Sequence, residues 1–118
     1  YPAENLLIYP STGALGYGLE YVYSIMERLR IAGLKGDKVV AMPMLCDIGI
    51  EVWGVKEAKA PEAEVPGWGD VERRGPLWEA STATVYLLAG ADLLIMRHPE
   101  AVRLTLGTIR KLMGGGDA

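Results

Sequence analysis

The residue types best suited to bind a ligand lie together near the start of the chain. Ser11 and Thr12 supply two hydroxyl groups, and they are followed by Gly13, Gly16 and Gly18. Because glycine has no Cβ, the backbone of such a loop can approach a ligand closely. The free N–H groups of a following helix point toward that ligand. The spacing is neither a dinucleotide-binding fingerprint nor a P-loop, so the residues alone leave a ligand site and a purely structural turn both open.

The chain has one histidine and one cysteine, which limits the chemistry it can perform. A closed zinc site within the chain is not expected, and no carboxylate can be assigned to complete a Ser/His/Asp set. His98 is either a ligand contact or a structural residue, and Arg97 pairs either with an anionic ligand or with Glu100. Cys46 has no evident basic neighbour, so we expect a quiet buried thiol. No catalytic residue and no metal ligand is predicted.

Methionines near the ends of two apolar runs are a further candidate surface. Met42, Met44 and Met96 form either a soft apolar surface for a large, flat ligand or part of the core.

Alternating strands and helices must position these residues. The apolar pattern predicts strands over residues 5–9, 39–45 and 92–96, and helices over 18–35, 48–60, 77–90 and from Pro99 onward. Gly36 is expected to end the first helix. Residues 61–76, rich in proline and glycine, are expected to form a long loop around Trp68. The continuously apolar strands suit a parallel sheet buried on both faces, and the alternation predicts an α/β fold of three parallel strands with flanking helices.

This arrangement is too small to close on itself. Three parallel strands leave two bare edges, whereas a complete (β/α)8 barrel takes about 250 residues. The chain of 118 residues is therefore predicted to be a partial (β/α)8 TIM-type barrel. Residues 1–113 would form it, with a long loop at about 60–76, and residues 114–118 would be a flexible tail. The carboxyl ends of the strands, where barrels carry their sites, are residues 10–18, 44–47 and 97–99.

Composition narrows the class of protein. The net charge is −3 and there is no basic block, so nucleic acid is not an expected partner. The apolar runs fall far short of the ~18 residues that a membrane span needs, and no signal peptide is recognisable. A single cysteine fits a cytoplasmic location and cannot hold an iron–sulfur cluster, which usually takes about four. The chain does not begin with Met, and we expect it to be a segment of a longer polypeptide.

Several stretches resemble one known family. They are Thr12-Gly13-Ala14-Leu15-Gly16-Tyr17-Gly18-Leu19-Glu20-Tyr21 with its continuation over 23–28, Met42-Pro43-Met44, Trp78-Glu79-Ala80, and the segments 88–92 and 96–101. In this order they are similar to the small subunit of the corrinoid iron–sulfur protein, also known as the delta subunit of the acetyl-CoA decarbonylase/synthase complex. The similarity covers nearly the whole chain, except the loop around 61–65 and the glycine tail.

The resemblance implies a later portion of a TIM-like barrel that pairs with a larger subunit. That partner would carry a [4Fe–4S] cluster and most of a corrinoid (cobamide), which would lie at the interface between the two. The pair would pass a methyl group between a tetrahydropterin methyltransferase and acetyl-CoA synthase. The corrinoid-ligating pattern Asp-x-His-x-x-Gly is absent at His98, so no histidine of this chain is expected to bind cobalt. The residues placed against the corrinoid are Thr12, Gly13, Ala14, Leu15, Gly16, Met44 and His98.

These observations predict a non-catalytic methyl-carrier subunit rather than a stand-alone enzyme. Two alternatives stay open at this point. One is a pterin-binding TIM-barrel methyltransferase that acts by itself, and the other is a purely architectural subunit of the complex.

Overall fold

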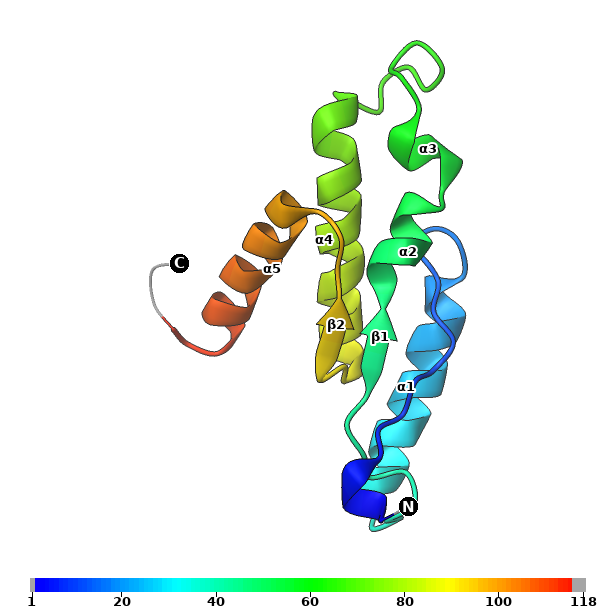
Figure 1. Cartoon of the computed structure of the whole chain (residues 1–118), viewed down its shortest axis with the longest axis vertical. Helices are drawn as coiled ribbons and strands as arrows, with labels where there is room; N and C mark the ends of the chain where they lie inside the picture. Colours follow the sequence, from blue (N-terminus) through cyan, green and yellow to red (C-terminus); the bar gives the residue numbers. More distant parts are fainter. Residues whose placement is uncertain (1, 116–118) are drawn as a thin grey trace.

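The computed structural model describes residues 2–115 and is shown in Figure 1. Its elements are the 3-10 helix η1 (Ala3–Asn5), the helices α1 (Leu19–Leu34), α2 (Ile48–Trp53), α3 (Lys56–Lys59), α4 (Val71–Ala89) and α5 (Pro99–Leu112), and the strands β1 (Leu45–Asp47) and β2 (Leu93–Ile95). Of the predicted tail, residues 116–118 lie outside the described residues.

The strands are parallel, as predicted. Cys46 of β1 lies opposite Leu94 of β2, and Ile8 forms a single parallel bridge with Met44. The segment around Ile8, β1 and β2 therefore lie side by side in chain order. This confirms the α/β class and the parallel arrangement. The described residues form no closed barrel.

Two predicted strands differ from the structure: the first, over 5–9, was too long, and the second, over 39–45, shares only Leu45 with β1. Asn5 belongs to η1, where its N–H donates to the Pro2 carbonyl at 3.0 Å, and only Ile8 of the first predicted strand forms a bridge. Residues 39 and 40 lie in a turn, and β1 begins only at Leu45. Pro43 lacks an N–H group and cannot pair as a strand interior does, so regular pairing starts after it.

The helix boundaries agree best where the apolar pattern was clearest. Helix α1 matches its prediction within a residue, and Gly36, just beyond its end, has a φ of +106°. The helix predicted over 48–60 is divided into α2 and α3, because Gly54, a poor helix former, ends the first of them. Helix α4 starts at Val71 rather than at 77, and Pro76 lies inside it. The predicted loop is therefore shorter than expected.

The core lies on one face of the strands. It is formed by α1, by β1 with the residue before it, by the first residue of α2 and by α4. Its members are Leu19, Val22, Met26, Met44, Cys46, Ile48, Ala83, Tyr86 and Ala89. Small residues on α4, such as Ala83, which is fully buried, allow this helix to pack closely in the core. Helices α1 and α4 both lie behind the strands in Figure 1.

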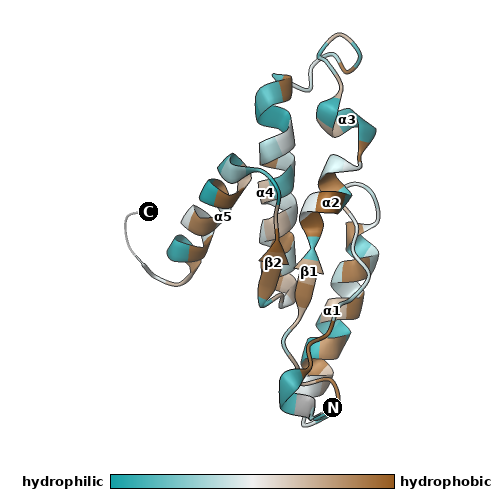
Figure 2. Cartoon of the chain, in the orientation of Figure 1, coloured by the Kyte–Doolittle hydropathy of each residue, from teal (hydrophilic) through white to brown (hydrophobic). Residues whose placement is uncertain are grey.

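The opposite face of the strands is open over residues 2–115. Leu93 is 51% exposed and Ile95 is 45% exposed, and Leu7 and Tyr9 are exposed beside them. Figure 2 shows these apolar strands on the side turned toward the viewer, away from α1 and α4. The prediction that the strands are buried on both faces was therefore wrong for the described residues, because helices cover only one face.

Candidate functional site

The glycine-rich loop ends at the amino terminus of α1, and α4 holds it in place. The Tyr86 hydroxyl accepts a hydrogen bond from the Gly13 N–H at 2.8 Å and donates one to the Gly13 carbonyl at 2.9 Å. The Thr82 hydroxyl accepts from the Leu15 N–H at 3.3 Å, and the Trp78 indole N–H donates to the Leu15 carbonyl at 2.9 Å. The N–H groups of Gly13 and Leu15 are thus bonded within the chain and are not available to a ligand.

The exposed part of the loop is its tip. Gly16 and Gly18 have φ angles of +86° and +100°, a backbone conformation that favours glycine. The Leu15 side chain is 42% exposed, and Tyr17 beside it is exposed as well. The loop therefore presents Leu15, Gly16 and Tyr17 outward, while Gly13 and Ala14 are buried beneath them.

Two carboxylates of the segment after β1 bind this loop. The Thr12 hydroxyl donates to Glu51 Oε1 at 2.9 Å, and the Tyr17 hydroxyl donates to Glu57 Oε2 at 2.6 Å. The second bond raises the pKa of Tyr17 above its ordinary value and lowers the pKa of Glu57. Both groups accordingly keep their usual protonation states near neutral pH.

A hollow of about 380 Å³ lies between the loop and these residues, and we call it the rim hollow. Its lining includes Ala14, Tyr17, Ile50, Glu51, Lys56 and Glu57. The carboxylates are hydrogen-bond acceptors, the Lys56 ammonium is a donor, and Ile50 and Tyr17 are exposed apolar surface. This combination suits the apolar face and polar edge of a large ligand.

His98 occupies a second place at the carboxyl ends of the strands, directly after β2. Its Nδ1 accepts a hydrogen bond from the Glu100 N–H at 3.1 Å and so caps α5, and Pro99 is the first residue of that helix, as predicted. The imidazole stacks on the Trp53 indole, with ring centroids 5.7 Å apart and an interplanar angle of 17°. Since Glu51 and Trp53 both belong to α2, this helix stands between His98 and the glycine-rich loop.

A buried carboxylate connects the residues around His98. Glu79 of α4 is fully buried, and it accepts hydrogen bonds from the Trp53 indole N–H at 2.6 Å, the Arg97 N–H at 2.6 Å and the His98 N–H at 3.1 Å. A buried carboxylate is stable only when such donors satisfy it. Glu79 therefore fixes the backbone at the end of β2 and the orientation of Trp53.

The structure brings Met44 neither to the rim hollow nor to the surroundings of His98. Its side chain is 1% exposed and packs on the helix-covered face, ahead of the first residue of β1. The residue at the carboxyl end of β1 is Asp47 instead. Met44 thus fills the core, which was the other role open to it.

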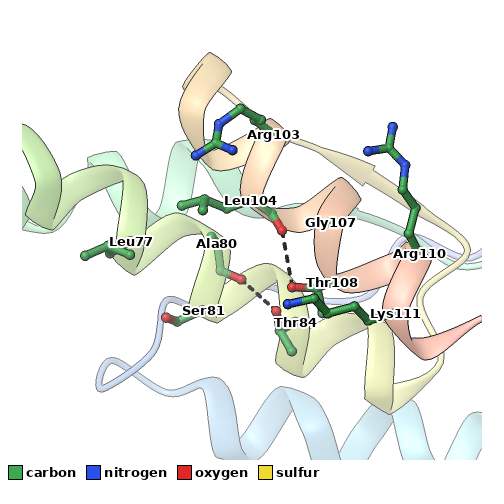
Figure 3. A pocket seen from close by; sticks show the side chains of 10 residues that line it. All are labelled: Leu77, Ala80, Ser81, Thr84, Arg103, Leu104, Gly107, Thr108, Arg110 and Lys111. Carbon is green, nitrogen blue, oxygen red and sulfur yellow. Dashed lines mark hydrogen bonds between the residues drawn. The ribbon is translucent and has the colours of Figure 1, made fainter. Parts of the chain in front are cut away.

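Another hollow, of about 410 Å³, lies in the groove between α4 and α5, away from the carboxyl ends of the strands (Figure 3). The Thr84 and Thr108 hydroxyls there donate to carbonyls of their own helices, at 3.0 and 3.2 Å. Arg103 and Arg110 are among the residues that line the groove, and the Arg103 guanidinium donates to Glu100 of its own helix at 2.8 Å. This surface offers shallow packing rather than a set of converging reactive groups.

Sequence reasoning missed the residues of α4 that hold the site. Glu79, Tyr86 and Trp78 were noted only within the helix or as part of a family resemblance. Glu79 and Tyr86 recur with Thr82 and Ala83 at helical spacing on the buried face, which is a signal that could have been used. What their polar atoms bind could not be inferred, because their partners lie far away in the chain.

Two negative findings apply to residues 2–115. No three side chains of His, Cys, Asp or Glu gather closely enough to hold a metal ion. No helix in this range has the length and apolar character needed to cross a membrane.

Comparisons with known proteins agree with one another. A family model described as CO dehydrogenase/acetyl-CoA synthase delta subunit matches residues 2–105. The acetyl-CoA decarbonylase/synthase complex subunit delta of Archaeoglobus fulgidus is 42% identical over 117 residues, which is 97% of this chain and 25% of that protein. Its namesake from Methanopyrus kandleri is 44% identical over 118 residues, 98% of this chain and 28% of that protein. The chain thus spans about a quarter of the length of these relatives.

Proposed function

The chain belongs to the CO dehydrogenase/acetyl-CoA synthase delta-subunit family, and on that premise we propose that it is part of a methyl-carrier subunit. This subunit covers a corrinoid held mainly by a larger partner, which also carries a [4Fe–4S] cluster. Together they pass a methyl group between a tetrahydropterin methyltransferase and acetyl-CoA synthase. The relatives' printed name, acetyl-CoA decarbonylase/synthase complex subunit delta, supports such an assembly.

The observation that carries this proposal is the rim hollow beside the exposed tip of the glycine-rich loop. Tyr17 and Ile50 expose apolar surface in its lining, and Leu15 exposes more at the loop tip beside it, which matches the flat face of a macrocycle. Glu51, Glu57 and Lys56 supply acceptors and a donor, which match the amide groups at its edge. The residues present therefore fit a corrinoid that approaches from outside.

In this role the chain's own residues bind and shield rather than react. The corrinoid, when bound, supplies the cobalt that carries the methyl group. Leu15 and Tyr17 cover its face and exclude water, and the hydrogen bonds of Tyr86 to Gly13 keep the loop in the shape that this requires. The proposal assigns no cobalt ligand to the chain, because the corrinoid-ligating pattern Asp-x-His-x-x-Gly is absent at His98.

The barrel is part of the same proposal. The open strand face, with Leu93, Ile95 and Leu7 exposed, is the face that would line the interior of a (β/α)8 barrel once further strands close it. Helices on one face only, and neighbouring strands in chain order, are the arrangement such a barrel requires. The relatives are about four times as long as the chain, which leaves ample sequence for the remaining strands.

One observation favours a second candidate, a purely architectural subunit. The N–H groups of Gly13 and Leu15 are bonded within the chain, so part of the glycine-rich loop serves its own packing. In that case the loop would support assembly of the complex without touching the corrinoid.

Substitution of Leu15 separates the two functions. In the complete heterodimer, Leu15→Gln should weaken corrinoid binding about tenfold, because removing a buried leucine contact costs roughly 1.5 kcal/mol. Assembly with the partner should not change. The matched control is Leu34→Gln, at the other end of α1, where the side chain is 81% exposed. Unchanged corrinoid affinity combined with weaker assembly would support the architectural function, and binding of a tetrahydropterin by the delta subunit alone would support a methyltransferase.

A further inference from the structure

A second hollow at the carboxyl ends of the strands lies on the other side of α2 from the rim hollow. Its inner part, of about 260 Å³, is lined by Trp53, Lys59, Arg97 and His98. A larger neighbouring part of about 610 Å³, which we call the outer part, shares Trp53, Lys59 and His98 and is also bordered by Glu72. We call the two parts together the Trp53–His98 hollow. The proposed corrinoid surface does not use it.

The walls of this hollow are held rigidly by α4. A Cβ at Gly75 would lie 2.3 Å from the Trp53 ring, so the indole packs directly on the backbone of the helix. One turn later, Glu79 accepts the indole N–H at 2.6 Å. Packing on Gly75 and the hydrogen bond to Glu79 thus fix the position and the orientation of the indole. The His98 imidazole stacks on this ring.

The same contacts decide which atom of His98 faces the ligand. Its Nδ1 accepts the Glu100 N–H, so in the neutral ring the proton is on Nε2. Within residues 2–115 no hydrogen-bond partner is found for Nε2, and His98 borders both parts of the hollow. A hydrogen-bond donor is therefore available at this wall.

Two cations complete the inner part. Within the described range, neither the Lys59 ammonium nor the Arg97 guanidinium has an ion-pair partner. The Arg97 backbone is fixed by Glu79 and by close packing on Gly49, where an added Cβ would lie 3.0 Å from the Arg97 nitrogen. Glu72 borders only the wider, outer part, so no carboxylate lines the inner one.

We propose that the Trp53–His98 hollow binds a phosphate group of an anionic ligand, through Lys59, Arg97 and the Nε2–H of His98. An arginine fork and an ammonium ion favour phosphate oxygens, and the amino terminus of α5, a helix of 14 residues beginning at Pro99, adds a favourable dipole. The Trp53 ring and the outer part leave room for the rest of the ligand. This inference is independent of the corrinoid proposal.

The test is calorimetric titration of the complete delta subunit with pyrophosphate at low ionic strength. Arg97→Gln and Lys59→Gln should each weaken binding at least tenfold, because hydrogen bonds to charged groups contribute about 1.5–3 kcal/mol. Neither side chain donates a hydrogen bond within the described residues, so both variants should keep the melting temperature of the parent protein. The matched control is Lys111→Gln in the groove between α4 and α5, which removes the same charge and should change the affinity less than twofold.

Three outcomes would overturn the proposal. The first is the absence of pyrophosphate binding to the parent protein. The second is an equal loss of affinity in Lys111→Gln, which would indicate a general effect of net charge. The third is equally tight binding of acetate, which would show a site for any small anion rather than for phosphate.

Discussion

Replacing Tyr86 by phenylalanine removes one oxygen atom that organises the glycine-rich loop. The ring is buried in the core and stays there, while the hydroxyl that both accepts from and donates to Gly13 is lost. Gly13 is itself buried, so its N–H and carbonyl groups lose their partner in a place that water does not easily reach. The perturbation is therefore confined to two hydrogen bonds and to the loop they hold.

The expected cost follows from those two bonds. Each buried hydrogen bond contributes about 1 kcal/mol net, and a group left without a partner costs more. Tyr86→Phe should thus destabilise the loop by about 2 kcal/mol, which corresponds to roughly a 30-fold change in an equilibrium constant. In hydrogen-exchange mass spectrometry of the complete subunit, amides of residues 12–18 should exchange about 30-fold faster.

The control is Tyr23→Phe, which removes a hydroxyl from a ring packed against the same core. Within residues 2–115 no hydrogen bond involves that hydroxyl, so exchange at residues 12–18 should not change. If Tyr86→Phe leaves the exchange of these residues as slow as in the parent protein, the phenol does not hold the loop. The proposed shape of the rim hollow would then lose its support.

Three further predictions concern other parts of the fold. Gly75→Ala should destabilise the subunit by about 1–3 kcal/mol in urea unfolding, because its Cβ would meet the Trp53 ring at 2.3 Å. The control Ser81→Ala, at an exposed position of the same helix, should be nearly neutral. An equal effect of both variants would contradict the close packing of Trp53 on Gly75. Arg74 is buried and donates to the carbonyls of residues 57, 60, 68 and 69, so Arg74→Lys should cost about 2–4 kcal/mol and increase proteolysis of the 60–70 loop, whereas Arg73→Lys, at an exposed position, should do neither. Burial and the charge of Asp92 raise the pKa of the Cys46 thiol to about 11. Because the raised pKa favours the protonated folded state, this contribution to stability is complete below the ordinary pKa and is lost as the pH rises through about 11. At pH 8 iodoacetamide should label Cys46 only after denaturation, and rapid labelling of the native protein would refute the burial.

The regular pattern of the chain was sufficient to predict most of its architecture. Apolar residues such as Val22 and Met26 repeat at helical spacing and give α1 within one residue. The alternation of apolar runs with helices predicted parallel strands, and β1 and β2 pair in this way. These predictions hold because they depend on local periodicity and on general rules of chain connection.

The residues that build the site follow no such pattern. Arg74 and Glu79 are charged residues within a helix, and charged residues are usually solvated. Both are buried instead, because backbone groups of other segments satisfy them. The start of α4 was hidden by the surrounding prolines and glycines, although Asp70, which accepts the Glu72 N–H at 3.0 Å, is a recognisable helix cap.

The glycine-rich loop shows most clearly what could not be predicted from the sequence. Its glycines indicated a close approach of the backbone to something, but the sequence did not distinguish a ligand from the chain itself. The structure shows that Gly13 and Ala14 are buried, with Gly13 bonded to α4, while Leu15, Gly16 and Tyr17 face outward. The first part of the loop, Gly13 and Ala14, thus serves the packing of the chain, and the second part, Leu15 to Tyr17, is accessible to a ligand.

The most direct test of the central claim is hydrogen exchange of the complete heterodimer with and without its corrinoid. The account predicts slower exchange with corrinoid bound at residues 15–18 and 50–57, which border the rim hollow. It predicts no change at residues 103–111 of α5, which line the groove between α4 and α5. Exchange at residues 15–18 that is the same in both states, or a change of equal size in α5, would contradict the claim that this rim faces the corrinoid.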